Sequence, residues 1–168
     1  MDREPHVLVI PFPAQGHAGP LMKLSMKIAE QGIKVTIFST EHMKAKIMAS
    51  MPQEAKKSSL ITVVSVPDGL ELQEAERKDF EKVTQSMLAV MPGCLKNFIE
   101  KVKESNDCEQ ISCVITDVAV GWALEIAEQM GIARAAVVTF APAYVPLVLH
   151  IPKLVEAGIL DSTGELQN

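Results

Sequence analysis

The chain has 168 residues, about the length of one compact domain, and 48% of them are hydrophobic, which is enough for a sizeable core. Its formal net charge is −5, and its lysines and arginines form no cluster longer than a pair, so the composition argues against nucleic acid as a partner. Its three cysteines lack the spacing of metal ligands and follow no secretory signal, which favours a reducing, cytoplasmic location and no metal site.

The N-terminal region predicts a strand, a loop and a helix. Residues 6–11 (HVLVIP) form a short apolar run, typical of a strand that is covered on both faces of a parallel sheet. From Gly19 the apolar residues follow helical spacing, and Gly32 ends the helix. Between them, residues 11–20 (PFPAQGHAGP) contain three prolines and two glycines, and they place His17 just before the helix.

The central region predicts two further strands with a short helix between them. The strands cover residues 33–39 and 60–66, and the helix covers residues 41–49. The second of these strands ends at residues 67–69 (Pro-Asp-Gly), a strong turn signal. The charge-rich residues 71–82 are expected to be a solvated loop that gives way to a helix.

The C-terminal half continues the alternation of helices and strands. Apolar spacing predicts a long helix over residues 79–103, bent or interrupted at Pro92-Gly93. Further along the chain we expect a strand over residues 111–117, a helix over residues 121–130, a strand over residues 133–140, and a helix over residues 143–157 that is interrupted at its prolines.

One uncharged segment, residues 135–152, is long enough to raise the question of a membrane span. Its three prolines each remove a backbone donor, and its β-branched first half is typical of a strand that leads into a helix. We therefore expect no stable membrane span.

Strands that alternate with helices predict an α/β fold with a doubly wound parallel sheet, in one domain. In the common strand order 3-2-1-4-5, the first and fourth strands are neighbours and the order reverses between them. His17 follows the first strand and Asp117 ends the fourth, so both side chains are expected at the carboxyl edge, where such sheets bind ligands.

A carboxylate beside an imidazole forms a general base. The carboxylate accepts a hydrogen bond from one ring nitrogen and stabilises the imidazolium, while the other nitrogen takes a proton. His17 and Asp117 are the candidates for this pair. Two plainer interpretations stay open: His17 as a loop residue or helix cap, and Asp117 as the N-cap of the helix that follows.

The glycines beside His17 allow close approach of a ligand. Gly16 and Gly19 precede a helix N-terminus, which favours an anionic group such as phosphate. The segment GHAGP matches neither the dinucleotide fingerprint nor the Walker A loop, and a tight strand-to-helix turn explains these glycines equally well.

Two blocks of the sequence resemble a known family. HVLVIPFPAQGHAGPLMKLSMKIAEQGIKVTIFST closely resembles the opening of plant UDP-dependent glycosyltransferases, and CVITDVAVGWALEIAEQMGI matches a second block. The resemblance implies a GT-B architecture, in which two Rossmann-like domains face each other across a cleft. This chain would be the N-terminal domain, which mainly binds the acceptor.

The resemblance also implies roles for individual residues. The catalytic histidine and aspartate fall on His17 and Asp117, and Gln15 and Gly16 match the loop that approaches the donor. Substrate-binding positions further along the chain fall on Ala119 and Pro142. The implied reaction transfers a sugar, glucose in the first instance, with inversion from a UDP-sugar to a hydroxyl of a small lipophilic acceptor. The UDP-sugar is a co-substrate, and no cofactor is expected.

The C-terminal signature of the family, a Trp-, His- and Gln-bearing segment that binds the sugar nucleotide, has no counterpart before Asn168. We therefore expect an incomplete N-terminal domain that lacks the UDP-sugar-binding domain, transfers no sugar by itself and tends to self-associate. The alternative is a non-catalytic small-molecule-binding or interaction module from a truncated gene. A flavodoxin-like nucleotide binder would need phosphate-loop features that the sequence does not contain.

Overall fold

A computed structural model describes residues 4–70, 79–105, 110–161 and 163–167. Its internal contacts divide the chain into two compact units, Met1–Val137 and Val138–Asn168, which are described separately here. The prediction that residues 1–168 belong to one domain stays a prediction.

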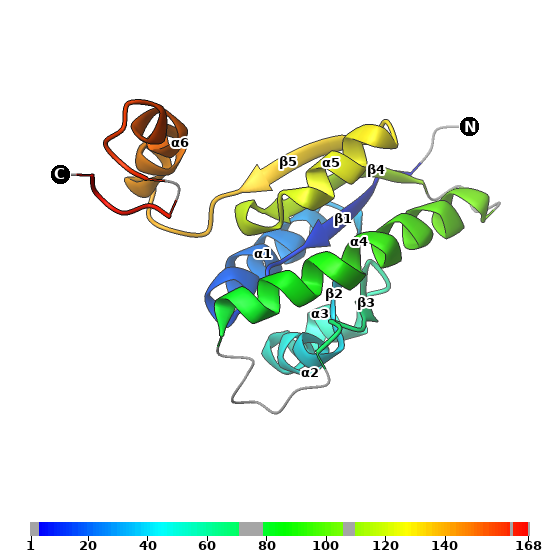
Figure 1. Ribbon diagram of the computed structural model, residues 1–168. Coiled ribbons are helices and arrows are strands. Elements are labelled where there is room, and N and C mark those ends of the chain that lie inside the picture. Colours follow the sequence, from blue (N-terminus) through cyan, green and yellow to red (C-terminus); the bar gives the residue numbers. More distant parts are fainter. Residues whose placement is uncertain (1–3, 71–78, 106–109, 162, 168) are drawn as a thin grey trace. The chain divides into compact units, whose positions relative to one another are not determined.

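The larger unit is built on a parallel sheet of five strands in the order β3-β2-β1-β4-β5 (Figure 1). This order confirms the predicted doubly wound sheet, with the reversal between its first and fourth strands. The strands are β1 (His6–Ile10), β2 (Lys34–Thr40), β3 (Ile61–Val66), β4 (Ile111–Asp117) and β5 (Ala133–Val137).

Strand β1 lies at the centre of the sheet, and all five of its residues are buried. Its Val9 is paired with Ile37 of β2 on one side and with Ile115 of β4 on the other. The central position explains why its sequence is apolar without alternation, because helices cover both faces of the sheet at this strand.

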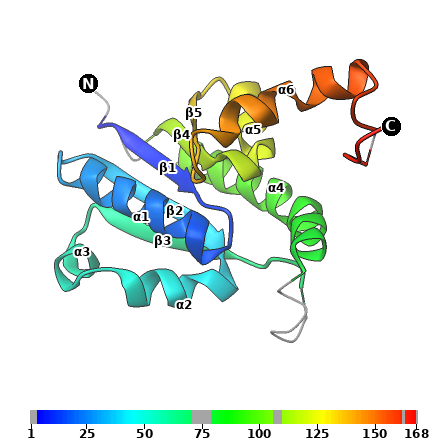
Figure 2. The ribbon, with the colours of Figure 1, turned by 90° about the vertical axis from the view of Figure 1, so that its left-hand side faces the viewer.

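Helices cover the sheet in two layers (Figure 2). One layer holds α1 (Gln15–Ala29), α2 (Glu41–Ser50) and the short α3 (Gln53–Lys57). The other holds α4 (Phe80–Glu104) and α5 (Trp122–Gln129). Each layer closes its own apolar core, one with Leu21 and Ile47 and the other with Met91 and Leu95 among its buried side chains. The two cores hold the carboxyl edges of β1 and β4 in place.

Several predicted boundaries are wrong. Helix α1 begins at Gln15, so the segment expected to be a loop is partly its first turn. Strand β5 ends at Val137, three residues earlier than predicted, and α3 was not predicted. Most of the charge-rich segment expected to be a loop, residues 71–78, lies outside the described residues.

The expected interruptions at prolines are also wrong. Helix α4 runs through Pro92, and α6 (Tyr144–Glu156) runs through Pro152. A proline inside a helix deprives the carbonyl four residues earlier of its donor. That residue is exposed in both helices, Leu88 before Pro92 and Val148 before Pro152, so water can reach the carbonyl.

The smaller unit consists of α6 and the segment that follows it. No side chain of α6 is buried, and Leu149 is 68% exposed. Beyond the helix, Leu160 and Leu166 form an isolated antiparallel bridge. Neither α6 nor any other helix in the described part of the chain is long and apolar enough to cross a membrane.

Candidate functional site

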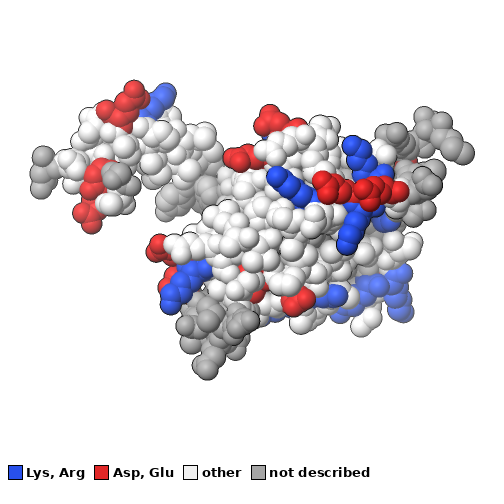
Figure 3. All heavy atoms as spheres, turned by 45° about the vertical axis from the view of Figure 1, so that its right-hand side comes forward, with Lys and Arg blue, Asp and Glu red and all other residues white. Residues whose placement is uncertain are grey.

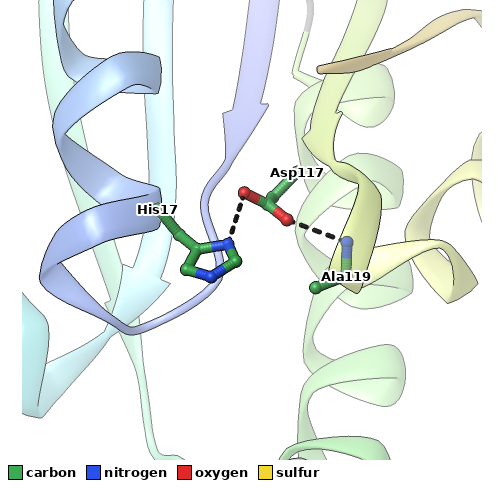
Figure 4. Close-up of polar contacts among 3 residues, drawn as sticks. All are labelled: His17, Asp117 and Ala119. Atoms are coloured by element: carbon green, nitrogen blue, oxygen red, sulfur yellow. Dashed lines mark hydrogen bonds and ion pairs between the residues drawn. The ribbon is translucent and has the colours of Figure 1, made fainter. Parts of the chain in front are cut away.

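His17 lies in the first turn of α1, not in a loop before it. The N–H of His17 donates to the carbonyl of Ala14 at 3.0 Å, and the N–H of Ala18 donates to the same carbonyl at 2.9 Å. Ala14 is the N-cap residue, with extended backbone and no side-chain cap. The chain thus leaves β1 and turns directly into the helix, which points the imidazole of His17 back toward the edge of the sheet (Figure 4).

Asp117 is the last residue of β4, and its side chain is fully buried. Its Oδ1 accepts a hydrogen bond from the backbone N–H of Ala119 at 2.8 Å. This bond caps the single 3₁₀ turn Val118–Val120, so the N-cap interpretation of Asp117 is correct for that turn. The cap fixes one carboxylate oxygen and leaves Oδ2 to face α1.

The two side chains meet across the switch point of the sheet, as predicted (Figure 4). His17 Nδ1 lies 2.9 Å from Asp117 Oδ2, although the residues are 100 positions apart in the sequence. The His17 side chain is 29% exposed, whereas that of Asp117 is 0% exposed. The carboxylate is therefore sealed from solvent while the imidazole remains accessible.

The contact also selects a tautomer of the imidazole. An ionised carboxylate only accepts hydrogen bonds, so a bond to Asp117 Oδ2 places a proton on Nδ1 of His17. The lone pair of neutral His17 is then on Nε2, which points away from Asp117 (Figure 4). This arrangement can accept a proton at Nε2 and balance the resulting charge at Nδ1.

Two phenylalanines that were not predicted as site residues lie beside this pair, one in contact with His17 and the other in contact with the first. The ring of Phe12, which follows β1, lies 5.3 Å from the imidazole of His17 between centroids. The Phe12 ring also lies 5.1 Å, between centroids, from the ring of Phe80, the first residue of α4. The only sequence signal was the position of Phe12 in the PFPAQGHAGP segment, and nothing marked Phe80.

The remaining predicted site residues are Gln15, Gly16, Ala119 and Pro142, and they belong to different parts of the chain. Gln15 and Gly16 are exposed in the same helical turn as His17, and Gln15 also lines an open cavity of about 560 Å³ between α1 and α2. Ala119 contacts Asp117 through its backbone N–H and is exposed. Pro142 belongs to the smaller unit, which is described separately, so its place in the site stays a prediction.

Other reactive groups also occur among the described residues of the larger unit. Among the residues that the structure describes, no group of three or more His, Cys, Asp or Glu side chains could hold a metal ion. Burial raises the pKa of the Cys113 thiol, which keeps it protonated near neutral pH. In the view of Figure 3, acidic and basic side chains lie close together on the larger unit. The chemistry of the site therefore rests on the imidazole and the carboxylate.

The sequence matches the family model described as "Glycosyltransferase, N-terminal domain" over residues 4–138. The chain belongs to this family. Its relatives include UDP-glycosyltransferase 83A1 of Arabidopsis thaliana, which is 40% identical over 97% of this chain. Linamarin synthase 1 of Manihot esculenta is 30% identical over 98% of the chain. The family resemblance seen in the two sequence blocks is thus confirmed.

Solved structures of plant glycosyltransferases share the fold. Os79 from O. sativa, solved in complex with U2F and trichothecene, superposes with a TM-score of 0.70 over 92% of this chain, at 19% identity. LpCGTa in complex with UDP gives a TM-score of 0.69 over 98% of the chain, at 20% identity. The fold is that of the N-terminal part of a GT-B glycosyltransferase.

The chain spans about a third of the length of these proteins. It covers 36% of UDP-glycosyltransferase 83A1 and 34% of linamarin synthase 1. In the solved structures it covers 37% of the Os79 chain and 37% of the LpCGTa chain. The activity of a whole protein of this family is therefore a matter of proposal for this chain.

Proposed function

We propose that the chain supplies the general base and the acceptor side of a UDP-sugar-dependent glycosyltransferase. The contact between His17 Nδ1 and Asp117 Oδ2 at 2.9 Å is the observation that carries the proposal. It supports a base because the buried carboxylate orients the imidazole, whose side chain remains 29% exposed. Membership of the glycosyltransferase family supports the reaction class.

The proposed reaction is a single displacement. His17 Nε2 takes the hydroxyl proton of the acceptor, and the acceptor oxygen forms a bond to the anomeric carbon of the sugar. The bond between that carbon and the UDP oxygen breaks, and its electron pair leaves with UDP. Because the acceptor attacks opposite the leaving group, the anomeric configuration inverts. Asp117 stabilises the imidazolium that results.

The proposed substrates are a UDP-hexose, with glucose first, and a small lipophilic hydroxyl compound. Gln15 and Gly16 are assigned to the donor side because they share the first turn of α1 with His17. Ala119 is assigned to the acceptor side because it adjoins Asp117. The assignment of Pro142 to the substrate site rests on the family resemblance alone. A second domain, outside the 168 residues, would hold most of the UDP-sugar.

The proposal includes no metal and no redox cofactor, because a base and a stable leaving group account for every bond made and broken. It also places the protein in the cytoplasm and gives it no nucleic-acid partner, as the composition suggests. These parts of the proposal are independent of the residue roles.

The test is UDP release from UDP-glucose with a panel of phenolic acceptors. It compares the longest natural protein that carries residues 1–168 with its His17→Ala variant. We expect His17→Ala to lower kcat by about 10² to 10⁴, the range that a positioned general base contributes. The 168-residue chain by itself is expected to show no useful transfer.

His42→Ala is the matched control, because His42 is a histidine of the surface helix α2 whose Nε2 lies 3.0 Å from Lys46 Nζ. It should leave kcat unchanged. A parent protein that binds these acceptors without releasing UDP would favour the non-catalytic module instead. Full activity of His17→Ala would refute the assignment of the base.

A further inference from the structure

Three rings form a continuous row that begins at the proposed base. The order is His17, Phe12, Phe80, with centroid distances of 5.3 Å and 5.1 Å between successive rings. The planes of successive rings are tilted by 58° and 32°, both within the range of favourable aromatic contacts. The row leads from the accessible imidazole to the surface of α4.

The middle ring is held rigidly. Phe12 is only 3% exposed and belongs to the core that α4 and α5 form with the sheet. It lies two residues after the end of the buried strand β1, and its carbonyl accepts a hydrogen bond from the N–H of Ala14 at 2.8 Å. Phe12 therefore holds one side of the imidazole in place while Asp117 holds Nδ1.

The outer ring is presented to solvent on a fixed helix end. Phe80 is 61% exposed at the first position of α4. The preceding residue, Asp79, caps the helix through its Oδ1, which accepts from the N–H groups of Glu81 and Lys82 at 3.1 Å and 3.2 Å. The next turn is anchored by Val83, which is buried in the core. The exposed ring thus has a defined backbone position next to Phe12.

We propose that Phe80 is a specificity-determining residue that selects acceptors with a flat aromatic body. The inference rests on the proposed function, and it deepens that function by naming the acceptor class. An aryl ring that stacks against Phe80 gains an aromatic contact that a saturated ring of the same size does not. The acceptor hydroxyl then lies toward His17, at the other end of the row.

The two ring contacts put an upper limit on the distance between Phe80 and the proposed base. The separation between Phe80 and His17 cannot exceed the total of the two centroid distances, 5.1 Å and 5.3 Å. A molecule of two or three fused or linked rings can stack on Phe80 at one end and place a hydroxyl near Nε2 at the other.

The experiment compares two acceptors with one carbon skeleton, 2-naphthol and trans-2-decalol, in the longest natural protein that carries residues 1–168. Each variant is compared with the parent on each acceptor separately, so the intrinsic reactivity of the two hydroxyls cancels. Phe80→Leu keeps an apolar side chain without a ring, and Phe80→Tyr keeps the ring. Leu88→Ala is the matched control, because Leu88 is another exposed apolar residue of α4.

We expect Phe80→Leu to raise KM for 2-naphthol about three- to tenfold, the factor that corresponds to one aromatic pair. It should change KM for trans-2-decalol by less than twofold and leave kcat and its pH profile unchanged, since the base is intact. Phe80→Tyr should restore the parent KM, and Leu88→Ala should have no effect. Equal losses for both acceptors, or an equal loss in Leu88→Ala, would overturn the proposal.

Equilibrium binding of 2-naphthol in the absence of a donor, measured by the fluorescence of 2-naphthol, tests the role of Phe80 independently of the proposed transferase function. Binding that weakens in Phe80→Leu, in a protein that transfers no sugar, would support the role of Phe80 and refute the proposed function. Sugar transfer with a KM for 2-naphthol that is unchanged in Phe80→Leu would support the proposed function and refute the role of Phe80. A parent protein that neither binds nor glycosylates 2-naphthol would overturn both.

Discussion

Asp117 accepts one hydrogen bond on each of its two carboxylate oxygens, whereas an asparagine side chain has only one oxygen that can accept. Its Oδ1 faces the N–H of Ala119 and its Oδ2 faces Nδ1 of His17. In Asp117→Asn the single amide oxygen stays with the Ala119 N–H, so the NH₂ group turns toward Nδ1. That nitrogen must then be unprotonated, which moves the proton to Nε2 and removes the lone pair that we propose as the base.

We therefore expect Asp117→Asn to lower kcat by about 10² to 10⁴ while the variant stays folded. The measurements are steady-state transfer and thermal unfolding on the same sample, with Asp161→Asn as a control at a half-buried aspartate of the smaller unit. A variant that keeps kcat within tenfold of the parent would show that Asp117 only caps the 3₁₀ turn.

The pair of His17 and Asp117 could be predicted because it depends only on strand order and on where two strands end. The contacts of Phe12 and Phe80 could not, because they depend on how the predicted helix packs against the end of β1. The sequence places the start of this helix within one residue, but no local pattern shows which strand end its first residue contacts.

At the scale of elements, the turn at Gly69 fixes α4 against the end of β3. Gly69 has φ +74°, and a Cβ atom there would lie 2.7 Å from Ser86 Oγ and 2.8 Å from a methyl carbon of Val90. The hydroxyl of Ser86 also donates to the carbonyl of Asp68 at 2.7 Å. The close packing of this turn helps to set the position of the helix that carries Phe80.

Gly69→Ala and Gly32→Ala form a matched pair, because Gly32 has φ +78° but open space around its Cβ position. Gly32→Ala should cost about 1–2 kcal/mol of unfolding free energy, from the left-handed backbone alone. Gly69→Ala should cost about 1–3 kcal/mol more, because α4 must also shift. Urea denaturation of both variants measures the difference, and equal costs would show that the turn is not tightly packed.

Most elements could be predicted from local pattern, and the errors have a common cause. Strand β4 was predicted to the residue because its apolar run ends at a charged side chain. The start of α1 was missed because Pro20 and the nearby glycines are helix-breaking signals. Pro20 is tolerated because Gly16, four residues earlier, is exposed and its carbonyl can bond to water. Local signals do not reveal which helix face meets solvent.

At the scale of the whole molecule, the exposed apolar side chains of α6 predict self-association of the 168-residue chain. Tyr144, Leu147 and Leu149 are among its large exposed hydrophobic residues. Contiguous exposed apolar surface of more than a few hundred Å² is unusual in monomeric proteins. Light scattering after size-exclusion chromatography should therefore show oligomers whose mass rises with protein concentration.

The double variant Leu147→Lys, Leu149→Lys should shift this chain toward the monomer, because charge on the helix surface opposes apolar contact. Gln53→Lys on the exposed face of α3 is the control for added charge. A parent chain that is monomeric at every concentration would contradict the prediction.

The separation of 100 residues between His17 and Asp117 has a consequence for how the site forms. During synthesis, β1, β2 and β3 emerge and can pair before β4 exists, so α1 can be complete while its histidine has no aspartate to bond. Closing so long a loop lowers the conformational entropy of the chain, and the contacts between β4 and β1 offset this cost only once β4 has docked. The pair of His17 and Asp117 is therefore expected to assemble late in folding, at the same step that joins the two halves of the sheet.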